Sequence, residues 1–198
     1  MTIRVVHQIF GPTFTDQRKS VTLKNVSAQT YGTRAGVAMG RHGKYQLDVT
    51  ARDVADVVRN AGGWLYDRAR AGWDVTVVVT TDCDVTPLRI LGVRTERATA
   101  EDDATAPPRA LALAASTEAM ADDTPLRDDV LRALKRGLTE VTLWGGATGP
   151  ERSVESVEHE LSAAARAFKA QALRAAGVDE PVGAVETFRR KSTALFGD

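Results

Sequence analysis

The stretch from Thr50 to Thr81, TARDVADVVRNAGGWLYDRARAGWDVTVVVTT, predicts one amphipathic helix followed by one buried strand. Apolar side chains recur in it at steps of three and four positions, which is the spacing of one face of a helix. Thr50 is expected to cap this helix, with Asp53 three residues later as in a capping box. The β-branched run after Gly72 is typical of a strand covered on both faces. The helical positions are Val54, Val58, Ala61, Leu65 and Ala69, and the strand is Val75–Val79.

Two adjacent glycines, Gly62 and Gly63, lie inside this predicted helix. Each costs about 1 kcal/mol relative to alanine in a helix interior, so another interaction must offset the loss. We expect a kink or a close approach of the helix to the sheet. The alternative is a ligand or partner that lies against the bare backbone.

The rest of the chain carries further helix and strand patterns. Together with the opening stretch they predict an α/β fold, with a small, mainly parallel or mixed sheet flanked by three main helices. The other two main helices are expected at about Pro125–Arg136, capped by Asp123 or Thr124, and at Glu151–Ala176. Strands are expected at Leu88–Thr95, Arg109–Ala115 and Glu140–Trp144, with a short helix as the alternative for the first and the start of a helix as the alternative for the second.

The 198 residues suggest one domain with appendages. Residues 1–47 form a basic, glycine-containing arm, residues 48–177 the α/β core with an acidic linker at 96–108, and residues 178–198 a tail or short helix. Charge follows this division. The arm has seven basic residues and one acidic residue, a net charge of +6, and the remainder has 19 basic and 25 acidic residues, a net charge of −6. Such segregation bears on partners rather than on fold.

Composition excludes several classes of protein. No run of 18 apolar residues predicts a membrane span, and no secretory signal is recognised, so a cytoplasmic location is expected. The single cysteine, Cys83, excludes an internal disulfide, and the three histidines lack metal-ligand spacing. We therefore expect no metal, no cofactor and no catalytic constellation, and we recognise no family in the sequence.

The best-placed candidate ligand site is the glycine-rich loop Gly145–Pro150. A strand, a glycine-rich turn and a helix N-terminus together expose backbone N–H groups to an anion. The loop matches neither the P-loop nor the dinucleotide-binding fingerprint, so a tight strand-to-helix connection is the alternative. Polar residues after other strands would join it if the strands are parallel; they can equally be ordinary turn formers. The candidate ligand residues are Gly145, Gly146, Thr148, Gly149, Asp82, Asp84 and Ser116.

The arm is the candidate surface for partners. Its aromatic residues alternate with basic ones, a pattern that can grip phosphates while it stacks on bases. It can equally wrap around the acidic body of its own or a neighbouring subunit. A protein partner or a homo-oligomer is therefore expected, with nucleic acid as the alternative and no membrane. The candidate partner residues are Arg34, Arg41, Lys44, Tyr31 and Tyr45.

Four aromatic residues cluster near the predicted helix–strand junctions. We expect them to anchor the core, because aromatic side chains bury large areas; exposed members would instead mark a protein interface. They are Trp64, Tyr66, Trp73 and Trp144.

The charge division and the poverty of catalytic groupings together predict a non-enzymatic α/β interaction or regulatory module, whose basic arm engages an acidic surface. The alternative is a small-ligand or nucleotide-binding protein, an enzyme included, that uses the Gly145–Pro150 loop with Asp82, Asp84 and Ser116.

Overall fold

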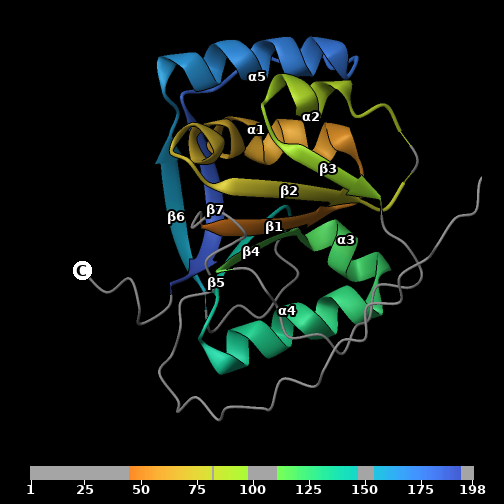
Figure 1. The fold of residues 1–198 in the computed structure, drawn as a ribbon, viewed down its shortest axis with the longest axis vertical. Coiled ribbons are helices and arrows are strands. Elements are labelled where there is room, and N and C mark those ends of the chain that lie inside the picture. Colours follow the sequence, from red (N-terminus) through yellow and green to blue (C-terminus); the bar gives the residue numbers. More distant parts are fainter. Residues whose placement is uncertain (1–44, 82, 98–110, 147–153, 193–198) are drawn as a thin grey trace, which may run out of the picture. The chain divides into compact units, whose positions relative to one another are not determined.

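The computed structural model describes residues 45–81, 83–97, 111–146 and 154–192, which belong to the unit Gly36–Asp198. They form a seven-stranded mixed sheet with helices on both faces (Figure 1). The predicted α/β class with three main helices is confirmed, while residues 1–44 of the basic arm lie outside the described residues. The strands are β1 (Gln46–Ala51), β2 (Asp74–Val79), β3 (Arg94–Arg97), β4 (Ala112–Ser116), β5 (Glu140–Trp144), β6 (Glu155–Glu160) and β7 (Val185–Lys191). The helices are α1 (Val54–Arg70), α2 (Thr86–Ile90), α3 (Thr117–Asp122), α4 (Thr124–Arg136) and α5 (Ala163–Ala175).

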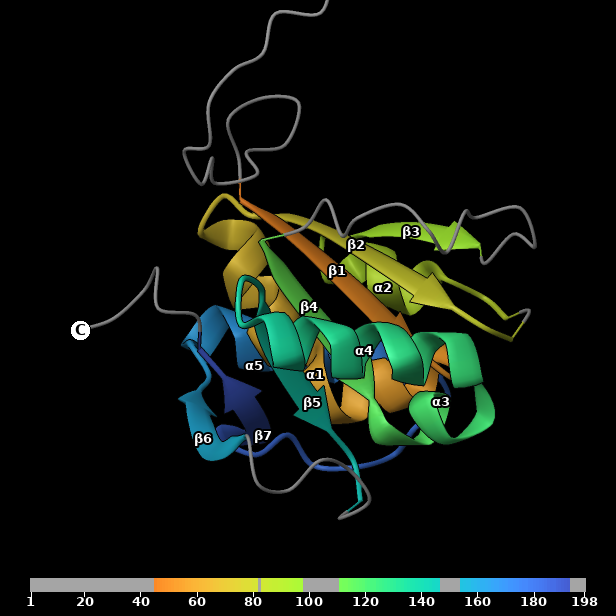
Figure 2. The same cartoon turned by 90° about the horizontal axis from the view of Figure 1, so that it is seen from below.

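The sheet has the strand order β3-β2-β1-β4-β5-β7-β6. The first five strands run parallel to one another, and β7 is antiparallel to both β5 and β6. The chain thus winds from β1 outward to β3, returns to β4 beside β1, and continues outward on the other side. Helices α1, α2 and α5 lie on one face of the sheet and α3 and α4 on the other (Figures 1 and 2).

The opening stretch folds as its pattern predicts, into α1 and β2. The predicted cap is wrong by three residues: Thr50 lies inside β1, and Asp53 caps the helix by accepting a hydrogen bond from the N–H of Asp56. The helix can begin only after the strand ends at Ala51, which leaves Asp53 as the first residue able to cap it.

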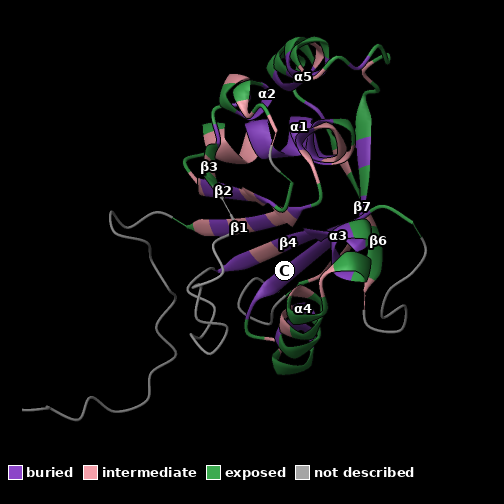
Figure 3. Cartoon of the chain, turned by 90° about the vertical axis from the view of Figure 1, so that its right-hand side faces the viewer, coloured by how far each residue is buried: buried purple, intermediate pink, exposed green. Residues whose placement is uncertain are grey.

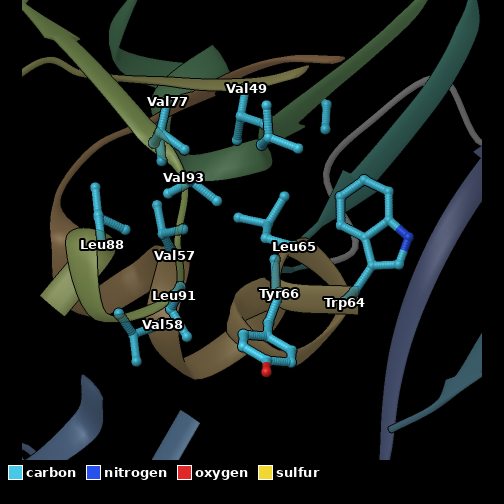
Figure 4. Close-up of a cluster of buried hydrophobic side chains, with 14 of the residues drawn as sticks. Val49, Val57, Val58, Trp64, Leu65, Tyr66, Val77, Leu88, Leu91 and Val93 are labelled. Carbon is cyan, nitrogen blue, oxygen red and sulfur yellow. The ribbon is translucent and has the colours of Figure 1, made fainter. Parts of the chain in front are cut away.

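Two apolar clusters hold the layers together, with the strands buried between the helices (Figure 3). The larger cluster joins α1 to β1 and β2, where Val57 and Leu65 face Val49 and Val77 (Figure 4). Three of the four aromatic residues predicted as core anchors are buried, namely Trp64, Tyr66 and Trp144. Trp73 is half-buried and packs against Tyr45, with the two rings tilted by 38°. No helix within the described ranges is long and apolar enough to cross a membrane.

The predicted single helix Glu151–Ala176 is wrong. Its described part contains β6, a turn at Leu161–Ser162, and then α5. In β6 exposed and half-buried residues alternate, as in an edge strand, and Val157 and Leu161 also fit helical spacing, which explains the error. The predicted tail or short helix at 178–198 contains β7, which fills the place between β5 and β6.

Leu88–Thr95 was also predicted as one strand, and it divides between α2 and β3. Pro87 in the first turn of α2 suits the start of a helix. The prediction for Arg109–Ala115 left strand and helix open, and the strand interpretation is confirmed by β4. The predicted helix Pro125–Arg136 is confirmed by α4, and of the two predicted caps it is Asp123 that accepts from the N–H of Leu126.

At the glycine pair, α1 comes close to another segment of the chain. A close approach was one of the interpretations offered in the sequence analysis. A Cβ atom on Gly63 would lie 2.5 Å from both terminal methyl carbons of Leu161, in the turn before α5. The neighbour is thus this turn and not the sheet. A Cβ atom on Gly62 would meet nothing closer than 3.4 Å, in Leu91. Only Gly63 is therefore required by space.

A polar cluster at the other end of α1 fixes the same turn. The Ser162 hydroxyl donates to Asp67 Oδ1 at 2.7 Å, and His159 Nε2 lies 3.0 Å from Asp67 Oδ2. Burial raises the pKa of Asp67, but the hydrogen bonds from Ser162 and His159 outweigh it and hold the pKa below its ordinary value of 3.8. The cluster joins α1 to β6 and to the cap of α5.

We expect Gly63→Ala to lower the free energy of unfolding by about 1–3 kcal/mol, because the added methyl group must displace the buried Leu161 side chain. Gly62→Ala is the matched control and should change it by no more than about 1 kcal/mol, in the stabilising direction if at all. Urea unfolding of both variants measures the difference. Equal stability of the two variants would contradict the close approach.

We expect Asp67→Asn to destabilise the protein at neutral pH and to matter less in acid. A carboxylate whose folded pKa is depressed contributes stability above its unfolded pKa, and this contribution is lost as the pH falls through the folded value. Urea unfolding between pH 3 and pH 7 should show a gap between parent and variant that is constant in the upper range and shrinks below about pH 4. A gap that widens in acid would show that folding raises the pKa of Asp67 and does not lower it.

Candidate functional site

The strand order reverses between β1 and β4, and the space outside the carboxyl ends of these two strands is here termed the crevice. The chain winds in one direction from β1 and in the other from β4, and these two strands are neighbours. In open α/β sheets, ligands bind outside the carboxyl ends of the strands where the order reverses. The crevice over β1 and β4 is therefore the candidate functional site.

Asp56 lies in this crevice, in the first turn of α1. Its two carboxylate oxygens each accept from the indole Nε1 of Trp144 at 3.2 Å, and Oδ1 also accepts from Asn60 Nδ2 at 2.8 Å. Trp144 ends β5, whereas α1 follows β1, so these bonds pass over the end of β4 between them. The half-buried carboxylate is thus held at the crevice by a buried donor. Sequence reasoning missed Asp56 because it placed the helix cap one turn too early.

Three of the predicted ligand residues come together here. Ser116 is the register partner of Trp144, and Gly145 and Gly146 follow Trp144 directly. Ser116 is fully buried and its hydroxyl accepts from the N–H of Ala119, so it caps α3 and does not face a ligand. Gly145 has a φ of +98° and packs against the Thr117 hydroxyl. The predicted alternative, a tight strand-to-helix connection, does not describe this loop, because the next described element after β5 is strand β6.

Asp84 is not part of the crevice. It lies in the turn between β2 and α2, beyond β1, where it accepts from the Thr86 N–H at 2.9 Å and the Thr86 hydroxyl at 2.7 Å. These bonds lower the pKa of the Asp84 carboxyl. The turn-forming role that the sequence left open is confirmed for Asp84. Thr148, Gly149 and Asp82 lie outside the described residues, as do the candidate partner residues Tyr31, Arg34, Arg41 and Lys44.

A pocket of about 280 Å³ adjoins the crevice along α1. Asn60, which binds Asp56, also lines the pocket. The opposite wall comes from residues 180–187, at the start of β7. Because β7 is antiparallel to β5 and pairs Arg189 with Leu143, its first residues lie beyond the carboxyl end of β5. The pocket and the crevice thus share one edge of the sheet.

A buried ion pair forms the floor of the pocket. Lys169 Nζ lies 2.6 Å from Glu186 Oε1, and both side chains are more than nine-tenths buried. Lys169 also donates to the carbonyl of Arg59, and Glu186 accepts from the backbone N–H groups of Gly63 and Trp64. An α-helix pairs the N–H of residue 63 with the carbonyl of residue 59, so the two side chains engage both groups of one turn of α1.

The sequence matches no protein family model and no curated protein. The fold, however, is similar to several solved structures. A pseudoaglycone deacetylase has a TM-score of 0.53 at 14% identity over 74% of this chain and 96% of its own. A teicoplanin deacetylase in its zinc-inhibited form has 0.51 at 13% over 73% and 97%. An N,N'-diacetylchitobiose deacetylase from Pyrococcus horikoshii has 0.50 at 13% over 77% and 85%. At these identities the likeness establishes a shared fold.

The predicted non-enzymatic interaction or regulatory module is therefore wrong, because the three solved structures named above, which share this fold, are deacetylases. The alternative prediction, a small-ligand-binding protein that includes enzymes, agrees better with them. The error came from the charge division, which describes what a surface attracts and not which fold or chemistry a chain has.

Zinc in one of these neighbours raises the question of whether this edge could hold a metal ion. Among the described residues, no three His, Cys, Asp or Glu side chains lie close enough to ligate one. Asp53 caps α1, and both oxygens of Asp56 accept from N–H groups. His159, on β6, is bound to Asp67 of α1. The described residues do not fit a metal centre, and no reaction step is derived through one.

We expect the floor of the pocket to be a major contributor to stability. Lys169→Met and Glu186→Gln should each lower the free energy of unfolding by about 3–5 kcal/mol, because each leaves a buried group without its partner. The double variant should cost less than the sum of the two, by about 0.5–3 kcal/mol. Urea unfolding measures all three, with Lys135→Met on the exposed face of α4 as the control. Strict additivity would contradict a direct coupling.

Proposed function

We propose that this protein is a hydrolase that removes an acyl group from an amide-bearing small molecule bound in the crevice over β1 and β4. The observation that carries the proposal is the Asp56 carboxylate, held across the strand-order reversal by Trp144 and Asn60 and adjoining a pocket. The fold shared with deacetylases supports the reaction class. We also propose that the protein is cytoplasmic, as the sequence predicts.

Asp56 has the role of general base in this reaction. It takes a proton from a water molecule, whose oxygen attacks the carbonyl carbon of the amide. The carbon–nitrogen bond then breaks, and the leaving nitrogen takes the proton back from Asp56. The products are a carboxylic acid and a free amine. Trp144 and Asn60 orient the carboxylate, since each donates to it from a fixed place on β5 or α1.

We expect Asp56→Asn to lower kcat by about 10²–10⁴-fold, the usual contribution of general acid–base catalysis. Asparagine keeps the shape of the side chain and an oxygen that accepts from Trp144, so folding should be preserved. The assay follows free amine released from a panel that contains N,N'-diacetylchitobiose and N-acetyl amino acids, with and without added Zn²⁺.

Asp129→Asn is the matched control, because Asp129 pairs with Arg132 on the surface of α4. It should retain parental activity. Release of amine at the same rate by Asp56→Asn and by the parent would exclude Asp56 as the base. Absence of amine release from every compound, under both metal conditions, would contradict a hydrolase.

A further inference from the structure

The pocket beside Asp56 has an ion pair at its floor. The single negative charge of Glu186 faces one ammonium group, that of Lys169, and two backbone N–H dipoles, those of Gly63 and Trp64. Helix amides that point at a carboxylate stabilise its charge just as a cation does. Lys169 is balanced in turn by Glu186 and by the carbonyl of Arg59, so the floor carries no net formal charge.

Lys169 has one further donor. An ammonium group has three N–H donors, and two of them are used, by Glu186 Oε1 and by the carbonyl of Arg59. The third can serve a ligand in the pocket, whose lining includes Lys169. The floor thus offers one charged N–H donor to an acceptor such as a carboxylate oxygen.

Arg59 lines the pocket, and its side chain is half exposed to solvent. Its Nε donates to Glu180 Oε1 at 3.0 Å, in an ion pair that is half exposed to solvent. Guanidinium has five N–H donors in a planar fork, and this bond commits the Nε donor only. The two terminal nitrogens can therefore bind a carboxylate with two parallel hydrogen bonds.

Arg59 and Asp56 lie three residues apart on α1, which places their side chains next to each other on the helix surface. Asn60 connects the two places, because it both binds Asp56 and lines the pocket. A ligand that spans them needs its anionic group only a few bonds from the amide that reacts. In an N-acyl amino acid, one carbon atom separates the carboxylate from the amide nitrogen.

We propose that the pocket binds the carboxylate of an N-acyl amino acid through Arg59 and Lys169, and that such compounds are the substrates. This inference rests on the proposed hydrolase function. Water then adds a hydroxyl group to the acyl carbon and a proton to the nitrogen, which releases the acyl group as a carboxylic acid and leaves a free amino acid. The pocket of about 280 Å³ suits a small amino acid.

The test compares N-acetyl-L-alanine with its C-terminal amide, which lacks the carboxylate. We expect kcat/KM to be at least about tenfold higher for the acid, the effect of one or two hydrogen bonds to a charged group. Arg59→Gln should remove this preference by raising KM for the acid while leaving the amide unchanged. Glu180→Gln, which frees the Arg59 guanidinium, should lower KM for the acid. Arg132→Gln on the surface of α4 is the matched control and should change neither.

Calorimetric binding to the Asp56→Asn variant separates this inference from the proposed function. Binding of N-acetyl-L-alanine that is lost with Arg59→Gln, without hydrolysis by the parent, would support the carboxylate pocket and overturn the hydrolase. Equal hydrolysis of acid and amide, unaffected by Arg59→Gln, would overturn the pocket and leave the hydrolase intact. Acetate that binds as tightly as N-acetyl-L-alanine would overturn the substrate assignment in favour of a site for the released acid.

Discussion

The contact between Lys169, Glu186 and the backbone of α1 is the constraint on which the rest of this structure depends. It fastens the central helix to α5 through one side chain and to β7 through the other. Burial of two charges costs several kcal/mol unless their hydrogen-bonding groups are satisfied. Here backbone groups of the helix supply what the ion pair lacks. Gly63 is then explained, since the helix must come within contact of Leu161 to reach Glu186.

Because of this contact, α1 has two surfaces with different roles, an apolar face toward the sheet and a polar surface at the carboxyl edge. Its apolar face packs on β1 and β2 and contributes more buried residues to the larger apolar cluster than any other element. Its first two turns carry Asp56, Arg59 and Asn60 along the carboxyl edge, between the crevice and the pocket. Because the ion pair fixes the middle of the helix, and Asp53 fixes its start, these side chains have a defined place relative to the strands.

The sequence predicted those parts of the fold that follow from local patterns. The spacing in α1, the β-branched run of β2 and the cap of α4 each encode their structure within a few residues. Strands β6 and β7 were missed because their charged sequences lack the apolar alternation by which strands are recognised. Glu186 and Lys169 could not be recognised as buried, since charged residues are almost always exposed unless paired, and their pairing depends on contacts across the chain.

The likeness to deacetylases concerns the fold, whereas the absence of three grouped metal ligands among the described residues concerns the chemistry. A fold determines where a ligand binds, here the strand-order reversal, while the side chains at that place determine the chemistry. The described residues put a carboxylate held by an indole N–H there, and not a group of three metal ligands. The chemistry must therefore be argued from Asp56 and from the charges around its pocket. Those charges belong to the same ion pair that orders the helix, so the group that fixes the fold also sets the electrostatic character of the site.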